Sequence, residues 1–204
     1  INGRSTRLGE ALIGSVGNRL TAWMEPRGNN PRLSHTFTPD VQGGVIDLDR
    51  DDVIYSGGID GIIRQYGSVY SSSPANEFPI GTAIRSISVS PKGNIIAVGG
   101  FDELVVASKT RRLDGNRDEL RIIGRHSFPP SDISDEDGSI TSIQVFADGA
   151  GVAARHGSKV YIFSLPQLAL QETLLDAYAS DLAAGPGAEL FVSTRDSVIQ
   201  FDAD

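Results

Sequence analysis

One short pattern recurs along the chain and constrains its fold more than any other feature. In the two clearest copies, residues 54–66 align with residues 96–108, so that the Gly-Gly-Ile-Asp turn at 57–60 falls on the Gly-Gly-Phe-Asp turn at 99–102. Weaker copies lie at residues 13–23, 153–163 and 191–201. The first apolar residues after the turns are spaced by 42, 42, 56 and 38 positions; they are Leu20, Ile62, Leu104, Val160 and Val198. Such a repeat indicates one structural unit copied along the chain. Each unit buries its apolar face by packing against the next unit.

Each unit is predicted to consist of short β-strands joined by tight turns. A further apolar run with its own turn precedes three of the copies, at residues 45–52, 84–93 and 140–149. Apolar and polar residues alternate within the runs, and Gly, Asp and Asn bound them, which is the pattern of half-buried strands. A period of about 40–45 residues with four short strands per unit is typical of a propeller blade. We therefore predict an all-β fold, a β-propeller of four-stranded antiparallel blades, with about four to five blades in this chain.

The repeats resemble those of the WD40 family over nearly all of the chain from about Ala11 on. An acidic or amide residue occupies the position that this family uses to tie the turn, in Asn18, Asp60, Asp102 and Asp196. Trp23 matches the family's terminal tryptophan, and the later units replace it with Tyr66, Ala107, Phe163 and Phe201. The family's Gly-His dipeptide is missing, although His35 and His126 lie in the corresponding regions.

The WD40 resemblance implies a non-catalytic scaffold, a subunit of a eukaryotic multiprotein complex that binds protein or peptide partners through propeller faces. It also implies an intracellular protein, nuclear or cytoplasmic. Propellers need roughly four to eight blades to close, and about seven is usual in this family. We therefore expect residues 1–204 to form a single partial propeller, a fragment or one that another segment or another chain completes, because an open propeller leaves sheet edges exposed. The expected blade units are residues 11–24, 41–70, 84–125, 140–165 and 178–202.

The interval of 56 residues contains an insertion, which we place at residues 108–138. Its first half is basic, with Lys109, Arg111, Arg112, Arg117, Arg121 and Arg125, and its second half is acidic and contains prolines. Long loops on a rigid scaffold often carry function, so we predict a docking arm for a partner. The expected contact residues are Arg111, Arg112, Arg117, Arg121, Asp135 and Asp137, with Ser134 as a candidate phosphorylation site in an acidic context. The alternative is a solvated hairpin followed by a linker.

Composition limits the kinds of partner. The formal net charge is −8 and the isoelectric point is about 4.8. This charge argues against a nucleic acid as the main ligand, because phosphate binding needs a surplus of Lys and Arg. The chain has no cysteine, so disulfides, thiolate metal sites and cysteine nucleophiles are excluded. No apolar run approaches the roughly 18–20 residues of a membrane span.

Patterns for catalysis and metal binding are weak. The histidines fall in different units without zinc-ligand spacing, and we expect His156 to be a rim residue in contact with solvent. No nucleophile elbow, phosphate-binding loop or dinucleotide fingerprint occurs. We predict no enzymatic activity, no cofactor and no metal.

The alternative is a propeller enzyme, or a propeller that binds Ca²⁺ through its acidic turns at residues 47–52 and 131–138. A run of alternate aspartates supplies the oxygens that Ca²⁺ prefers. In the repeat alignment, however, residues 49–52 fall on residues 91–94 and 147–150, and these favour β-turns that join two strands of a blade.

Overall fold

The structure is a computed structural model. It describes residues 6–8, 11–16, 19–24, 32–37, 44–51, 53–67, 71, 73–111, 118–129, 139–174, 181–185, 189–194 and 196–202, and up to residue 37 it describes the backbone only. In these ranges all regular elements are β-strands. Across them, no helix has the length and apolar character needed to cross a membrane.

Within the ranges just given, nineteen strands form five antiparallel sheets, each built from consecutive strands. Blade 1 contains β1 (Thr6–Leu8), β2 (Ala11–Val16), β3 (Arg19–Met24) and β4 (Arg32–Phe37). Blade 2 contains β5 (Val45–Leu48), β6 (Ile54–Gly57), β7 (Ile62–Tyr66) and β8 (Asn76–Pro79). Blade 3 contains β9 (Ser86–Val89), β10 (Ile95–Gly99), β11 (Glu103–Arg111) and β12 (Asp118–Ser127).

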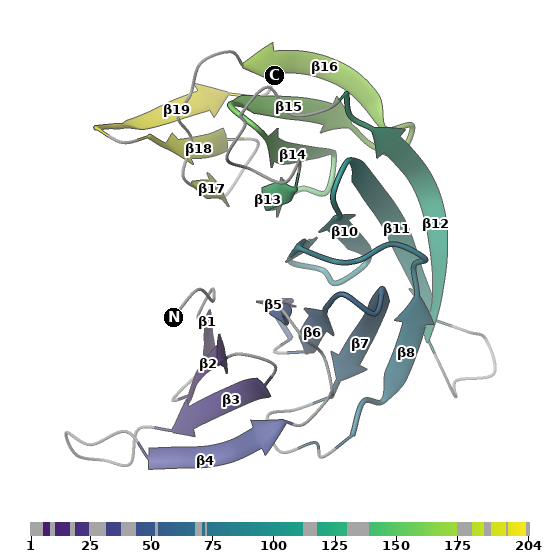
Figure 1. Ribbon diagram of the computed structural model, residues 1–204, viewed down its shortest axis with the longest axis vertical. Helices are drawn as coiled ribbons and strands as arrows, with labels where there is room; N and C mark the ends of the chain where they lie inside the picture. The colour runs from purple at the N-terminus through teal and green to yellow at the C-terminus, as the bar shows by residue number, and fades with distance from the viewer. Residues whose placement is uncertain are drawn as a thin grey trace.

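Blade 4 contains β13 (Ile140–Val145), β14 (Gly151–His156), β15 (Lys159–Ser164) and β16 (Ala169–Leu174). Blade 5 has three strands in the described ranges, β17 (Asp181–Ala184), β18 (Glu189–Ser193) and β19 (Val198–Asp202). The blades follow one another around a common centre, and the arc is open between blade 1 and blade 5 (Figure 1). The predicted fold, an all-β partial propeller of WD40-like blades, is confirmed.

From blade 2 to blade 5, apolar side chains fill the space between neighbouring blades, so strands in the middle of blades 3 and 4 are buried on both faces. In β10, Ile96 and Val98 pack toward blade 2, whereas Ala97 between them packs toward blade 4. The core between blades 2 and 3 contains Tyr55, Ile63, Phe78, Ile84, Ile87, Ile96, Val98 and Val105. The core between blades 3 and 4 contains Ala97, Leu104, Val106, Phe128, Ile140, Ile143, Val152, Tyr161 and Phe163. Burial of such side chains is the main stabilising contribution to folding.

Polar side chains tie the innermost strands of neighbouring blades together. In three places a side-chain oxygen of one inner strand accepts a backbone N–H from the inner strand of the next blade. The pairs are Asp47 Oδ2 with Val89 N (2.7 Å), Ser88 Oγ with Val145 N (3.0 Å) and Ser142 Oγ with Leu182 N (3.2 Å). These hydrogen bonds set the position of each inner strand relative to the inner strand of the blade before it.

The paired glycines of the repeat are explained by close approach of the next blade. A Cβ on Gly57 would lie 2.8 Å from side-chain carbons of Ile84, and a Cβ on Gly99 would lie 2.5 Å from Cγ2 of Ile140. In both blades the carbonyl of the following glycine accepts the N–H of the same isoleucine at 2.9 Å. Only glycine leaves room for this junction between blades.

Candidate functional site

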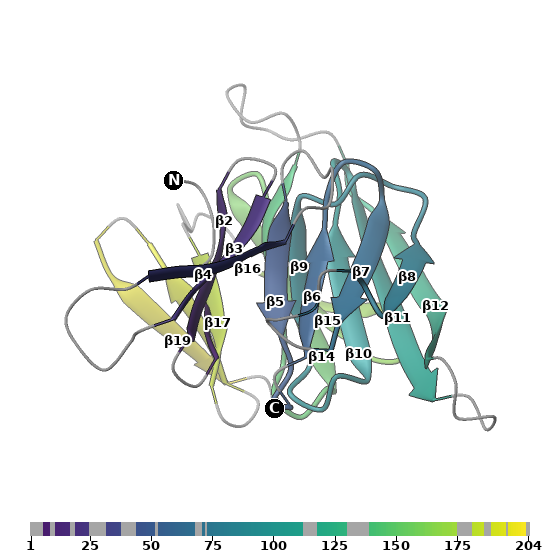
Figure 2. The ribbon, with the colours of Figure 1, turned by 90° about the horizontal axis from the view of Figure 1, so that it is seen from below.

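The hairpin formed by β11 and β12 departs most from the repeat. Its strands have nine and ten residues, whereas the other described strands have three to six. The strands pair from Glu103 opposite Ser127 to Arg111 opposite Asp118, with one bulge beside Val106. Seen from the side, the hairpin reaches farther than β7 and β8 of blade 2 (Figure 2). The insertion therefore begins as an extension of two blade strands.

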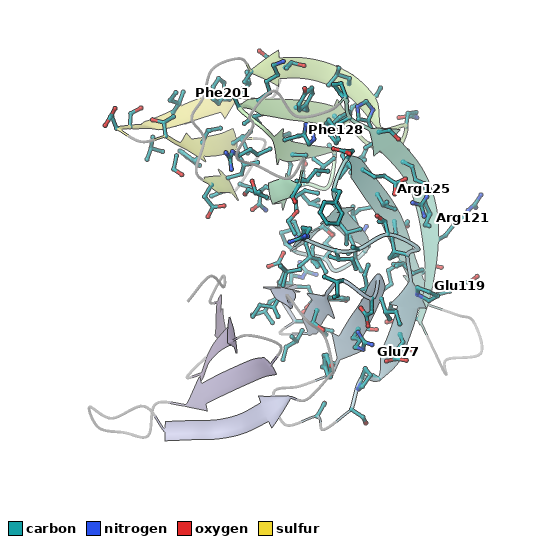
Figure 3. The ribbon with its side chains drawn as sticks, in the orientation of Figure 1. Glu77, Glu119, Arg121, Arg125, Phe128 and Phe201 are labelled. Carbon is teal, nitrogen blue, oxygen red and sulfur yellow. The ribbon has the colours of Figure 1, made fainter. Side chains whose placement is uncertain are left out.

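The structure describes part of the predicted contact residues. Arg121 lies in β12 with an exposed side chain that points outward (Figure 3). Arg111 is the last residue of β11, and only its backbone is described. The remaining predicted residues, Arg112, Arg117, Ser134, Asp135 and Asp137, lie outside the described residues.

Arg125 differs from Arg121 although both are arginines of β12. Its guanidinium donates to Glu103 Oε2 at 2.8 Å and to the carbonyl oxygen of Ile80 in blade 2 at 2.6 Å. The side chain of Arg125 is thus part of the joint between blades, whereas Arg121 faces outward.

A buried polar network fastens the hairpin to blade 2. Tyr55, which is fully buried, donates its phenolic O–H to Asp49 Oδ2 at 3.2 Å. Lys109 Nζ of β11 donates to Tyr55 Oη at 2.5 Å and lies 3.5 Å from Asp118 Oδ2. Gln65 Nε2 of blade 2 donates to the same Asp118 oxygen at 3.1 Å. Burial, followed by the nearby charge of Asp49, raises the pKa of Tyr55, so the phenol remains a donor.

A shape contact holds the hairpin from the other side. Leu168, in the turn before β16, has a positive φ of 53° and is 9% exposed. It packs against β12 at Gly124, and a Cβ added to that glycine would lie 2.9 Å from Leu168 Cβ. The ring of His126 packs on Phe163 of blade 4 with centroids 4.7 Å apart. Desolvation lowers the pKa of His126.

The expectation that His156 contacts solvent at the rim is wrong. Its side chain is 3% exposed, and its ring stacks on Phe128 with centroids 4.9 Å apart and an interplanar angle of 18°. Its Nε2 lies 3.3 Å from Oδ1 of Asp102 in the turn of blade 3. The histidine is buried because the turn of blade 4 packs beneath the segment that follows β12. Alignment of single units does not show this contact between units.

Asp49, Arg50 and Asp51 lie in the connection between β5 and β6. Asp49 is 7% exposed, and its Oδ1 accepts the N–H groups of Asp51 (3.0 Å) and Val53 (3.1 Å). Its backbone N–H bonds to the carbonyl of Val53, as those of Ser90 and Phe146 do across their own turns. Asp49 is therefore equivalent to Ser90, one position earlier than the repeat alignment placed it, because the turn of blade 2 is one residue shorter.

Sequence patterns missed the residues that hold the hairpin in place. Lys109 was one of several basic residues in the insertion, and Asp118, Gly124 and Leu168 had no distinguishing signal. The described residues contain no group of three or more His, Cys, Asp or Glu that could hold a metal ion.

Comparison with known proteins gives a likeness of fold. No protein-family model matches the sequence, and no curated protein matches it significantly. Among solved structures, the β-propeller domain of Cps50 (Swd1) from Myceliophteria thermophila is similar, with a TM-score of 0.70 at 13% identity. The match covers 98% of this chain and 63% of that chain, so this chain spans less than two thirds of its length. The chain thus has the fold of a partial WD40-type β-propeller.

Proposed function

We propose that this protein is a non-catalytic scaffold subunit of a multiprotein complex, which binds protein or peptide partners through its propeller faces and through the β11–β12 hairpin. The observation that carries the proposal is the hairpin itself: two strands longer than all other described strands, fastened to both neighbouring blades. A rigid arm loses little conformational entropy when a partner binds. The similarity to a WD40-type propeller domain supports a scaffold role in general.

The contact residues in this proposal are the arginines of the hairpin, Arg111, Arg112, Arg117 and Arg121, followed by the acidic segment with Asp135 and Asp137. Phosphorylation of Ser134 would add negative charge close to these arginines along the chain and would alter the charge presented to a partner. We further propose that another segment or another chain completes the propeller, because the arc is open between blade 1 and blade 5 (Figure 1). In support, blade 5 has three strands in the described ranges and Val198 in β19 is 68% exposed.

The test compares partners that co-purify with the full chain from cells of its source. One variant carries Arg112→Glu and Arg121→Glu in the hairpin. The control carries the same charge change in neighbouring turns, Arg50→Glu and Lys92→Glu, at two exposed positions. We expect at least one stoichiometric partner to fall by roughly tenfold or more with the hairpin variant only, because like charges placed together in an interface are strongly unfavourable. Equal recovery of every partner by all three proteins would contradict the hairpin's role.

A further inference from the structure

The outer edge of blade 3 is open to another strand. In the described part of the chain, β12 pairs with β11 alone, and its ten residues make it the longest strand there. An unpaired strand edge presents a row of N–H and C=O groups that can pair with a further strand. The outer strand of blade 2, β8, has four residues, so the edge of β12 is the more extensive of the two.

The direction of the backbone groups along this edge follows from the β10 side of the hairpin. The N–H of Lys109 donates to the carbonyl of Asn94, which precedes β10, so Lys109 directs its backbone groups away from β12. In an antiparallel ladder its partner in register, Leu120, then directs its own groups away from β11. Ile122, two residues farther along, is opposite Ala107 and does the same. Both N–H groups point to the open edge.

The extent of the open edge is set by the residues beside it. Toward the C-terminal end of β12, the Arg125 side chain is engaged by Glu103 and by the carbonyl of Ile80 in blade 2. We call residues 118–122 the open edge. Its other end is fixed by Asp118, which accepts from Gln65 and lies 3.5 Å from the Lys109 ammonium.

The side chains of the open edge alternate in chemistry. Glu119 and Arg121 are exposed, and within the described residues neither forms an ion pair. Leu120 packs on the core between blades 2 and 3, and Ile122 is 38% exposed. One face of the edge is therefore charged, with an acid and a base two residues apart, and the other face is apolar.

We propose that the open edge receives an extended segment of a protein partner as an added β-strand. The segment carries a carboxylate opposite Arg121, a cation opposite Glu119 and a β-branched residue opposite Ile122. Main-chain hydrogen bonds supply affinity in this mode of recognition, and the alternating side chains supply specificity. This inference rests on the proposed function in one respect, which is that the ligand is a protein. The fastening of the hairpin to both neighbouring blades holds the edge in place before the partner arrives.

The test uses a short capped peptide that alternates valine with charged residues, with glutamate opposite Arg121 and lysine opposite Glu119. NMR of the full chain is expected to show slower amide exchange at Leu120 and Ile122 when the peptide is added. The amide of Arg121, which faces β11, is expected to remain unchanged. A peptide with glutamate and lysine exchanged should bind about threefold to tenfold more weakly, because cross-strand charge pairs contribute modestly. The double variant Glu119→Arg with Arg121→Glu should prefer the exchanged peptide.

Two substitutions at one position separate strand addition from other binding. Ile122→Pro removes an N–H that faces outward and leaves the donors toward β11 in place, so binding should be lost while the melting temperature shows a folded chain. Ile122→Thr keeps the N–H and should retain binding. Unchanged affinity in Ile122→Pro, or peptide binding without protection of Leu120 and Ile122, would overturn the proposal. If cellular partners are lost with the hairpin charge variant but retained with Ile122→Pro, strand addition is wrong and the proposed function stands.

Discussion

Blade 3 meets its two neighbours through different chemistry, although both junctions derive from the same repeat. Against blade 2, the outer part of the junction is polar, with Tyr55 between Asp49 and Lys109. Against blade 4, it is aromatic, with Phe128 in contact with the rings of His126, His156, Tyr161 and Phe163. The comparison shows that the repeat determines the spacing of the blades and leaves the chemistry of the outer junction free to vary.

The two junctions should respond differently to substitution. The aromatic junction depends on buried area and shape, so deletion of a ring is its most damaging change. The polar junction depends on every member having a partner, because a buried donor or acceptor left alone costs about 1–3 kcal/mol.

The largest expected effect is at the aromatic junction. Phe128 is 5% exposed and contacts four rings, so Phe128→Ala should lower the free energy of unfolding by about 3–5 kcal/mol. Urea denaturation measures the change. The control is Phe101→Ala, a ring that is 39% exposed and stacked under Arg85, which should cost about 1 kcal/mol or less. Similar losses in both variants would show that the cluster is not a packed junction.

The contact between Gly124 and Leu168 should also be sensitive to shape. Gly124→Ala places a Cβ 2.9 Å from Leu168 Cβ, and we expect a loss of about 1–3 kcal/mol through overpacking. Because the conflict involves one partner, the double variant with Leu168→Gly, which removes that Cβ, should lose less than the sum of the two single variants. Strict additivity in this double-mutant cycle would argue against the contact.

At the polar junction, Tyr55→Phe removes the hydroxyl and leaves Asp49 Oδ2 and the Lys109 ammonium without that partner. The expected loss of unfolding free energy is about 1–2 kcal/mol, measured by the same denaturation. The matched control is Tyr161→Phe, since no hydrogen bond of the Tyr161 hydroxyl is present among the described residues; it should be nearly neutral. If Tyr55→Phe leaves the free energy of unfolding unchanged, the network does not hold the hairpin in place.

The junctions should also differ in their dependence on pH. Desolvation lowers the pKa of His126, so its contribution to stability should be present above about pH 6.5 and be lost as the pH falls. The raised pKa of Tyr55 has the opposite sense, because above about pH 10 the unfolded phenol ionises first and stability falls as the pH rises. Denaturation midpoints across both ranges, with His126→Phe and Tyr55→Phe as references, check each sign. If the denaturation midpoint changes with pH in the same way in the variant and in the parent chain, that group does not cause the pH dependence.

The smallest expected effect concerns Ca²⁺ at the acidic turn. The carboxylate of Asp49 already accepts two backbone N–H groups and the Tyr55 hydroxyl, so we expect no shift of the melting temperature between millimolar Ca²⁺ and chelator. A ligand that binds the folded state must raise the midpoint. A clear rise of the melting temperature with Ca²⁺ would show that the turn is a candidate metal site after all.

Several features of the fold could be predicted because their signals are local. The alternation of residues 84–89 and the Gly-Gly-x-Asp turns at 57–60 and 99–102 depend on backbone geometry within a few residues, and the repeat made them visible. The hairpin region was expected as an insertion, with Arg121 among the residues that contact a partner. The lengths of β11 and β12 could not be predicted, since basic residues are as compatible with a loop as with a strand.

The sequence by itself determined the strands, their turns and their assembly into successive blades, because these depend on neighbouring residues and on a repeated pattern. Only the tertiary structure decided that His156 is buried against Phe128, that Lys109 meets Tyr55 across 54 positions and that Gly124 accommodates Leu168. These contacts join residues of different blades, so they depend on the rotation of each blade about the common centre. That rotation is set by the packing of whole sheets, and no short stretch of sequence encodes it.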